Sequence, residues 1–537
     1  MRSSRLTALV ILGGVVVGGV VLDATDTTPP RDDDVARVVA GVAMPAATPP
    51  GTLSSTWYCA GGTATDDGFA DHVVIIANPT DEAHQAVVTV LTGGFAAPPV
   101  APDTSGASTT TTAAPATTAT TEPPPEAPAP TVVEVPALSR IEVPLRDIVK
   151  APLVSAIVEI EGGELAVEHQ ITSLEEGGGR ATSPCATSAA QSWSFPWGVT
   201  ERGARELLVF MNPFPDDATI TIDFATDEGT RQTLRFQNFV VPSRSVVGAY
   251  VDEDVTRKSQ VSAQVEVGSG RVVVDRIQTF DGTNPALEGI TLGLGAPEPA
   301  EVWAFPAGSS GEGSTEQIVV FNPTDDVAEV EVEVRLDDPV TNGVPEPFEA
   351  TVPPHRYALV DLHEPDLEET PETPRRIPEG VMHSIIVRSL NQVPVAVEKV
   401  LTRSAPLENL GVGVTLGSPL AAPRWLLVAG GVNEERAERV TLFNPSTDTI
   451  ARFDIDALDD GQTLVIETLQ DLEIAPGGHR TILVSDHVEL ETLPLVVTAD
   501  APIVVERGLF RIGGRGISLS MGIPVAEDVL VLDPIDT

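Results

Sequence analysis

Two cysteines, Cys59 and Cys185, are the residues of this chain whose type points most directly to covalent chemistry. An even count fits one disulfide bond formed in an oxidising compartment. Because Cys59 follows Trp57 and Cys185 precedes Trp193, the bond would join the two ends of one domain. The alternative is a pair of free thiols that bind a metal, but no cluster of His and Cys accompanies them.

A second set of candidate residues combines an arginine and an acid that recur four times. They would form either four equivalent ligand sites or a framework contact in which each guanidinium binds a carboxylate within its own domain. Recurrence in every copy favours the framework role. The predicted structural pairs are Arg140 with Glu168, Arg244 with Asp275, Arg356 with Glu398, and Arg480 with Glu506.

Tryptophan rings are candidates for stacking on sugars. Four of the five open equivalent segments of the chain, which favours a role in the core: Trp57, Trp193, Trp303 and Trp425. Trp197, in Ser-Phe-Pro-Trp-Gly, has no counterpart in the other segments. We therefore predict that Trp197 is a surface residue that contacts a ligand.

Sequence motifs of the common enzyme classes are absent, including Gly-x-Ser-x-Gly, His-Glu-x-x-His, Cys-x-x-Cys and a phosphate-cradling loop. Acid clusters such as Asp252-Glu253-Asp254 lack the alternating ligands of a calcium loop, so calcium bridging is the weaker alternative. We predict no catalytic residue, no metal site, no cofactor and no enzymatic activity. The net charge of -46 argues against nucleic acid as a partner, because phosphate binding needs clustered Lys and Arg.

A fourfold repeat must position these residues. Its marker is Asn-Pro, which ends an apolar run at Asn78, Asn212, Asn322 and Asn444. Its period of about 110 residues fits one domain per copy. Short alternating runs between turn signals predict antiparallel β-sandwiches of the immunoglobulin-like type, with Asn-Pro as a framework motif. A four-bladed propeller is the alternative, but its blades of about 40 to 50 residues are too short.

The predicted fold class is mainly β, with an N-terminal transmembrane helix followed by four tandem modules. An insertion at 97–130 is rich in Pro and Thr and is predicted to be disordered, with O-glycosylation as a further possibility. The four modules are residues 53–190, which contain the insertion, 191–297, 298–421 and 422–537.

The N-terminus predicts the location of the protein. Residues 1–24 hold an apolar run that follows Arg2 and Arg5 and precedes several acids, which fits a single-pass anchor with a cytoplasmic N-terminus. The alternative is a cleaved signal peptide and a secreted protein. Residues 25–52 are predicted to be a disordered spacer that is acidic and rich in Pro.

The anchor, the opening Trp57-Tyr58-Cys59-Ala-Gly-Gly and the Asn-Pro-Thr strands resemble an uncharacterised group of actinobacterial proteins, known only as a domain of unknown function (family 5719). The resemblance implies an extracytoplasmic, non-enzymatic envelope protein that is membrane-anchored or secreted, and it brings no site residues. Our leading hypothesis is a membrane-tethered structural or interaction protein whose partner is an unknown envelope protein or glycan. The alternatives are an array that binds cell-wall glycan or another extracellular ligand and, least favoured, an enzyme.

Overall fold

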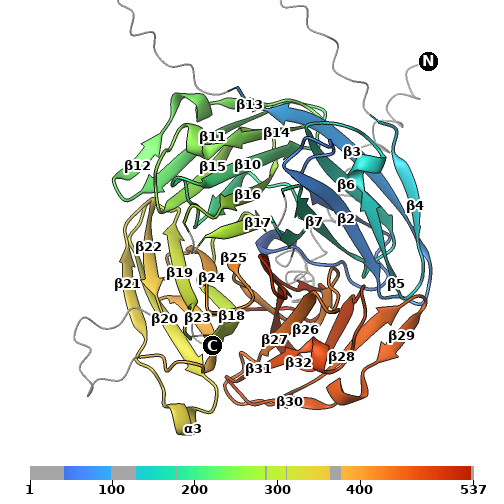
Figure 1. The fold of residues 1–537 in the computed structure, drawn as a ribbon, viewed down its shortest axis with the longest axis vertical. Helices are drawn as coiled ribbons and strands as arrows, with labels where there is room; N and C mark the ends of the chain where they lie inside the picture. Colours follow the sequence, from blue (N-terminus) through green and yellow to red (C-terminus); the bar gives the residue numbers. More distant parts are fainter. Residues whose placement is uncertain are drawn as a thin grey trace, which may run out of the picture.

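The computed structural model describes residues 41–97, 128–175, 178–284, 287–309, 311–362 and 376–533. The described chain forms four modules around a common centre, and the sequence runs once around the ring (Figure 1). The first module therefore lies beside the last. We name them module 1 (β1–β8), module 2 (β9–β17), module 3 (β18–β25) and module 4 (β26–β35). The predicted mainly β architecture is confirmed.

Each module has an inner sheet, which ends at the strand nearest the centre of the ring. From the edge to the centre, the inner sheets contain β5 (Ser139–Pro144), β2 (Ala70–Asn78), β7 (Ala166–Ser173) and β8 (Arg180–Pro184) in module 1; β14 (Ser245–Tyr250), β10 (Ala204–Asn212), β16 (Val273–Asp281) and β17 (Glu288–Leu294) in module 2; β22 (Arg356–Asp361), β19 (Ser314–Asn322), β24 (Ala396–Arg403) and β25 (Gly411–Leu416) in module 3; and β31 (His479–Leu483), β27 (Arg436–Phe443), the second half of β32 (Leu495–Arg511) and β33 (Ile517–Met521) in module 4.

The remaining strands form an outer sheet in each module. They are β1 (Ser54–Cys59), β6 (Leu153–Glu161), β3 (His84–Phe95) and β4 (Thr131–Val135) in module 1; β9 (Ser192–Phe195), β15 (Val261–Ser269), β11 (Ala218–Thr226), β12 (Gly229–Gln232) and β13 (Phe239–Val241) in module 2; β18 (Val302–Ser309), β23 (Met382–Ser389), β20 (Ala328–Leu336) and β21 (Phe348–Val352) in module 3; and β26 (Leu420–Leu427), the first half of β32, β28 (Ala451–Asp459), β29 (Gln462–Val465), β30 (Leu472–Ile474), β34 (Ile523–Pro524) and β35 (Leu530–Val531) in module 4.

Helices in the described residues are single turns, namely α3 (Pro339–Asn342), η1 (Leu145–Asp147), η2 (Leu234–Phe236), η3 (Val251–Glu253), η4 (Glu467–Leu469) and η5 (Val484–Asp486). None of the helices in the described part has the length and apolarity that crossing a bilayer requires. The predicted anchor at 1–24, and all of the predicted insertion except residues 97 and 128–130, lie outside the described residues.

Burial of the strands explains why the two sheets differ in sequence. β20, an outer strand, alternates Val with Glu or Arg, and its Ala, Val and Leu side chains are buried while the charged ones are not. In contrast, β16 is buried at every position from Val273 to Gln278. An inner sheet is covered on both faces because it packs against its own outer sheet and against a neighbouring module.

Strand order within a module differs from that of the predicted immunoglobulin-like type. In an immunoglobulin domain the first strand lies beside the second. Here β1 pairs with β6, and β2 pairs with β5 and β7. The antiparallel two-sheet arrangement is thus observed, while the immunoglobulin-like assignment is not confirmed.

The Asn of each Asn-Pro repeat is buried and joins the two sheets of its module. The Asn78 amide donates to the carbonyl oxygens of Glu82 (2.7 Å) and Val135 (3.2 Å), while its Oδ1 accepts from the Thr80 N–H (3.0 Å). Because Val135 ends β4, an edge strand of the outer sheet, this hydrogen bond links β2 of the inner sheet to β4. Equivalent bonds are made by Asn212, Asn322 and Asn444, so the repeat has the predicted framework role.

The four innermost strands close the ring. β8 contacts β17 and β33, and β25 contacts the same two strands. The Thr182 N–H of β8 donates to the Ser518 Oγ of β33 (2.9 Å), which links the first module to the last. Apolar cores also cross the borders, since Leu426 and Val428 of module 4 belong to the core of module 1. A short parallel pairing of β3 with β14 joins modules 1 and 2.

A buried pair of titratable groups crosses every module interface. The third strand of each inner sheet carries an acid followed directly by a base or a histidine: Glu168-His169, Asp275-Arg276, Glu398-Lys399 and Glu506-Arg507. Successive residues of a strand point to opposite faces, so the acid and the base of one module face different neighbours. Each base therefore lies opposite the acid of the next module.

Distances confirm this cyclic exchange. The nitrogen-to-oxygen separations are 2.8 Å for Arg276–Glu398, 2.6 Å for Lys399–Glu506, 2.7 Å for Arg507–Glu168 and 3.4 Å for His169–Asp275, and each of these side chains is at most 2% exposed. Three of the acids also accept a backbone N–H from the module that supplies the base, donated by Trp197, Ala307 and Ala429. The ring thus closes through four equivalent contacts.

The predicted pairing of each arginine with the acid of its own module is wrong. In three modules the strand that carries the arginine pairs with the strand that leads to the repeated Asn, but in different registers. Arg140 pairs with Ala77, Arg356 with Asn322 and Arg480 with Leu442. Arg244 precedes β14 altogether. The four arginines Arg140, Arg244, Arg356 and Arg480 thus occupy non-equivalent positions, and the acids Glu168, Asp275, Glu398 and Glu506 bind groups of the neighbouring module instead.

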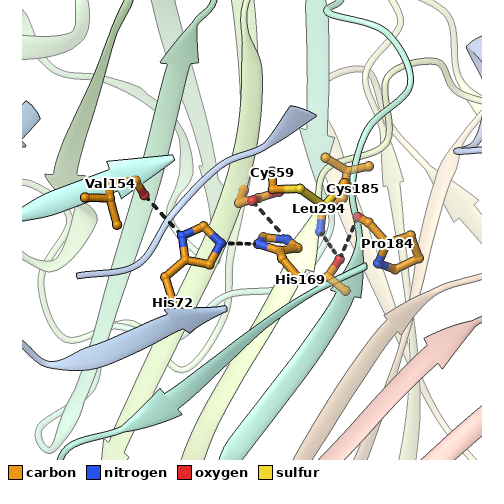
Figure 2. Close-up of a disulfide and its surroundings, with 9 residues drawn as sticks. Cys59, His72, Val154, His169, Pro184, Cys185 and Leu294 are labelled. Carbon is orange, nitrogen blue, oxygen red and sulfur yellow. Dashed lines mark hydrogen bonds and ion pairs between the residues drawn. A yellow bond between two sulfur atoms is a disulfide. The ribbon is translucent and has the colours of Figure 1, made fainter. Parts of the chain in front are cut away.

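The predicted disulfide is confirmed (Figure 2). Cys59 ends β1 and Cys185 follows β8, so the bond of 2.05 Å joins the outer and inner sheets of module 1. It closes a sequence separation of 126 residues. A cross-link of that span stabilises by about 4 to 5 kcal/mol if it acts on the entropy of the unfolded chain.

The predicted disorder of residues 25–52 is wrong for the described part, 41–52. Met44 and Ala47 are buried, the Met44 sulfur accepts a hydrogen bond from Ser418 Oγ (3.3 Å), and Ala47 pairs with Val525. This segment borders a cavity of about 60 Å³ at the C-terminal ends of the innermost strands. Burial of its apolar side chains explains the order, and the rest of the predicted spacer lies outside the described residues.

Replacing Arg276 tests the cyclic exchange. Arg276→Met leaves the Glu398 carboxylate buried without its partner, so we expect the free energy of unfolding to fall by about 3 to 5 kcal/mol. Arg356→Met is the matched control, since Arg356 is half-buried and forms no ion pair with a described residue. Denaturant unfolding of both variants is the measurement. Equal midpoints for the two would contradict the exchange, whereas Arg276→Met combined with Glu398→Leu should recover most of the loss.

Candidate functional site

A cleft of about 310 Å³ lies between modules 1 and 4. Its module 1 wall comes from β7, β8 and the described residues between them, Glu175, Gly178 and Gly179. Its module 4 wall comes from the starts of β27 and β33 and the end of β32. It borders the buried Arg507–Glu168 pair through Thr182, whose hydroxyl lies 3.4 Å from the Arg507 guanidinium. The cleft is therefore the outward continuation of one module interface.

Strand alternation places the side chains of the cleft. Glu168 of β7 faces module 4, so Gln170 and Thr172 face the same way at steps of two. Arg507 of β32 faces module 1, and Arg511, four residues later, follows it. Neighbouring strands add the residues opposite, because Thr172 pairs with Arg180 and Arg511 pairs with Arg436.

Five arginines line this cleft: Arg140, Arg180, Arg436, Arg511 and Arg515. Arg515 pairs with Glu288 (2.6 Å) and Arg140 pairs with Glu142. The other three form no ion pair with any acid in the described segments. Two acids, Glu175 and Glu435, also line the cleft but lie beyond ion-pair distance of its arginines. The cleft is thus locally cationic in a chain whose net charge is -46.

Electrostatics within the cleft are repulsive. Burial lowers the pKa of Arg180, and the guanidinium of Arg436 lowers it further, as do Arg140 and Arg511, whereas Glu142 opposes the change. Burial also lowers the pKa of Arg140, although Glu142 opposes that change. Arginine remains charged despite such changes, so the positive charges persist side by side. An anion placed among them would relieve this repulsion, and guanidinium groups bind phosphate and carboxylate in bidentate fashion.

Of the residues predicted from the sequence to be functional or structural, two lie at this cleft. Arg140 lines it, and Glu168 forms the buried pair beneath it. The prediction that Trp197 is a surface ligand contact is wrong, because its side chain is only 3% exposed. The ring packs against Phe280 and the valines of module 3, and the backbone N–H of Trp197 donates to Glu398 (2.8 Å). The four repeated tryptophans are buried as predicted.

A second set of buried titratable groups stands six residues before each repeated Asn: His72, Glu206, Glu316 and Glu438. Burial lowers the pKa of His72 to about 4 and raises the pKa of Glu206 to about 8 and that of Glu438 to about 7. His72 Nε2 lies 3.0 Å from His169 Nδ1 (Figure 2). Neither Glu206 carboxyl oxygen has a hydrogen-bond partner among the described residues, so burial favours the neutral form of this carboxyl.

The interface between modules 1 and 2 differs from the other three in its chemistry. Burial lowers the pKa of His169 well below its ordinary value, with a further contribution from His72, and burial raises the pKa of Asp275 well above its own. Burial thus disfavours the charged form of both groups. At the other three interfaces the base is Arg or Lys.

Sequence reasoning missed the bases of the exchange and the cleft arginines. A signal for the bases was present, since each repeated acid is followed by His, Arg, Lys or Arg. The cleft arginines carry no local signal because they come from segments far apart in the chain. Within the described residues, no group of three or more His, Cys, Asp or Glu is placed to hold a metal ion.

Glu206 gives a test of the buried carboxyls. The ordinary pKa near 4.5 rises to about 8 in the folded protein, so the unfolded state loses its proton first as pH rises. Between these values the stability of the fold falls by about 1.4 kcal/mol per pH unit. Glu206→Gln removes this loss, and thermal unfolding should show the variant more stable than the wild type at pH 8 and equal to it at pH 4.

Glu266→Gln, on the exposed side of β15, is the control and should leave the pH dependence unchanged. A Glu206→Gln variant with the same pH profile as the wild type would show that the buried carboxyl is not the cause.

Comparisons with known proteins assign no activity. No curated protein matches the chain. Among solved structures, the crystal structure of Thermotoga maritima 1070 is 20% identical over 22% of this chain and 95% of its own, with a TM-score of 0.18. The Anabaena sensory rhodopsin transducer is 23% identical over 19% of this chain and 96% of its own, with a TM-score of 0.15. At these values neither likeness carries an argument about this chain.

A protein-family model matches part of the chain, and it is the family that the opening motif and the Asn-Pro strands resemble. The matched segment runs from the start of β6 through most of module 2, and it contains both β7, which carries Glu168, and the Asp275-Arg276 pair. Residues 149–286 of the chain match the model of a family of unknown function, DUF5719.

Proposed function

We propose that this chain is a membrane-tethered, extracytoplasmic interaction protein of the bacterial cell envelope, without enzymatic activity, that binds an anionic group of its partner in the cleft between modules 1 and 4. The observation that carries the proposal is a set of three arginines at one interface that form no ion pair with a described residue: Arg180, Arg436 and Arg511. The immunoglobulin-like character of the modules and the membrane anchor remain predictions.

Comparison of the four modules supports a functional role for two of these arginines, Arg436 and Arg180. The position of Arg436 is taken by Ala70, Ala204 and Ser314 in the other modules, each eight residues before the repeated Asn. The position of Arg180 is taken by Ile290, Val412 and Ile517, each four residues before the partner of the repeated acid. The other three modules fold without an arginine at these positions. The framework therefore does not require Arg436 and Arg180, which supports a role for them in binding.

Charge repulsion among the arginines supports the same conclusion. Clustered like charges destabilise the folded state, and stability of this kind is commonly given up at functional sites. The surrounding chain is strongly acidic, so the cleft is a local site of opposite sign. A small or extended anion would meet attraction there and repulsion over most of the remaining surface.

Position in the ring is consistent with a tethered receptor. Residues 43–45 border the C-terminal ends of the innermost strands, whereas the cleft is lined by Arg180 and Gly516 at their N-terminal ends. The two sites are separated by the length of a central strand. If residues 1–24 anchor the chain, the cleft opens on the end of the ring opposite to the tether.

Removal of two cleft arginines tests the proposal. We expect the full-length protein to bind inorganic phosphate or sulfate in isothermal titration calorimetry, and Arg436→Ala/Arg511→Ala to weaken that binding by at least about tenfold, because charge-assisted contacts are lost. The double variant should also unfold at the same or a higher temperature, since repulsion is relieved.

Arg452→Ala is the control, because Arg452 is exposed and pairs with Glu473 away from the cleft. Wild-type protein that binds neither anion, or a double variant that binds as tightly as the control, would refute the proposal. A double variant that unfolds at a much lower temperature would instead assign the arginines to the framework.

A further inference from the structure

The cleft contains hydrogen-bonding groups that a bare anion cannot use. Gln170 and Thr172 line its module 1 wall, and their side chains form no hydrogen bond with another described residue. Gln170 offers both a donor and an acceptor, and Thr172 offers a hydroxyl. Phosphate or sulfate alone would use the donors of this wall but leave its acceptors without a partner.

The two carboxylates of the cleft are further hydrogen-bond acceptors. Glu175 and Glu435 are exposed acids of the lining, and an ionised carboxylate only accepts hydrogen bonds. A ligand that displaces water from these carboxylates must therefore bring donors as well as negative charge. Ammonium donors would be repelled by the five arginines, whereas neutral hydroxyl groups would not.

The module 4 wall adds an apolar surface. Ala437 and Leu509 line the cleft and are half-buried, so some of their surface remains accessible. The C–H face of a sugar ring or the carbon chain of a polyol can cover such a surface while its hydroxyls point to the polar wall. The volume of about 310 Å³ lies at the lower end of the range for small-molecule sites, about 300 to 1,000 Å³. It fits one or two ring units better than a protein segment.

We infer that the ligand of the cleft is an acidic saccharide unit, that is, a sugar or polyol that carries a phosphate or carboxylate group. Arg180, Arg436 and Arg511 hold the anionic group, and Gln170, Thr172 and Glu435 recognise the hydroxyls. This inference rests on the proposed anion-binding function and names the chemical class of its ligand. The same chemistry occurs in free sugar acids and in the units of an acidic polymer.

A ligand series separates these cases. Calorimetric titration of the full-length protein would use inorganic phosphate, glucose 6-phosphate, galacturonic acid, its linear tetramer, and glucose. We expect glucose 6-phosphate or galacturonic acid to bind at least about tenfold more tightly than phosphate, because each added hydroxyl contact contributes to affinity, and glucose not to bind measurably. Tighter binding of the tetramer than of the monomer assigns the site to a polymer, and equal binding assigns it to a free sugar acid.

Two variants test which side chains bind the hydroxyl groups of the ligand. Glu435→Ala should tighten binding of phosphate, because a negative charge leaves the cleft, and at the same time reduce the preference for glucose 6-phosphate over phosphate to less than about threefold. Gln170→Leu should also reduce the preference for glucose 6-phosphate over phosphate to less than about threefold, because a hydroxyl contact is lost. Glu434→Ala is the control, because Glu434 is exposed, adjacent in sequence and outside the cleft lining.

The outcomes distinguish this inference from the proposed function. Equal affinity for phosphate and for both sugar acids in the wild type overturns the inference and leaves anion binding intact. A preference that persists unchanged in both Glu435→Ala and Gln170→Leu also overturns it. Failure of every anion to bind overturns the proposed function as well.

Discussion

The exchange of buried charges between neighbouring modules is the constraint on which the rest of the structure depends. An acid and a base on successive residues of one strand cannot meet, because they point to opposite faces of the sheet. Burying either group without its partner would cost several kcal/mol, so neighbouring modules can pack together only where an acid of one lies opposite a base of the other. Each module uses both of its neighbours in this way. In a chain of four modules, every acid lies opposite a base only when the last module returns to the first.

Closure explains why other features of the fold are located where they are. The innermost strands contact one another where the buried pairs hold neighbouring inner sheets together. The hydrophobic cores continue across the module borders for the same reason. Burial disfavours the charged forms of His169 and Asp275 at the interface between modules 1 and 2, and there the β3–β14 pairing adds a backbone connection.

The cleft uses the rigidity of the ring. Its two walls belong to the first and the last module, and the Arg507–Glu168 pair fixes their distance. Guanidinium groups that repel one another are held in place because the strands that carry them are fixed by this pair and by the contact of β8 with β33. A preorganised site of this kind loses little conformational entropy when a ligand binds. The framework and the binding site are thus built from the same interface.

Local patterns in the sequence determined the β class, the fourfold repeat, the framework role of Asn-Pro, the buried tryptophans and the disulfide. These follow from residues close together in the chain, or from two cysteines that have only each other as partners. The ring, the charge exchange and the cleft were decided by tertiary structure alone, because their partners are distant: Glu168 and Arg507 are separated by 339 residues. Arg140, Arg244, Arg356 and Arg480 look equivalent beside their prolines, yet strand register places them differently. Trp197 is unique in the repeat but buried, because a neighbouring module covers it, and no property of its own segment reveals that neighbour.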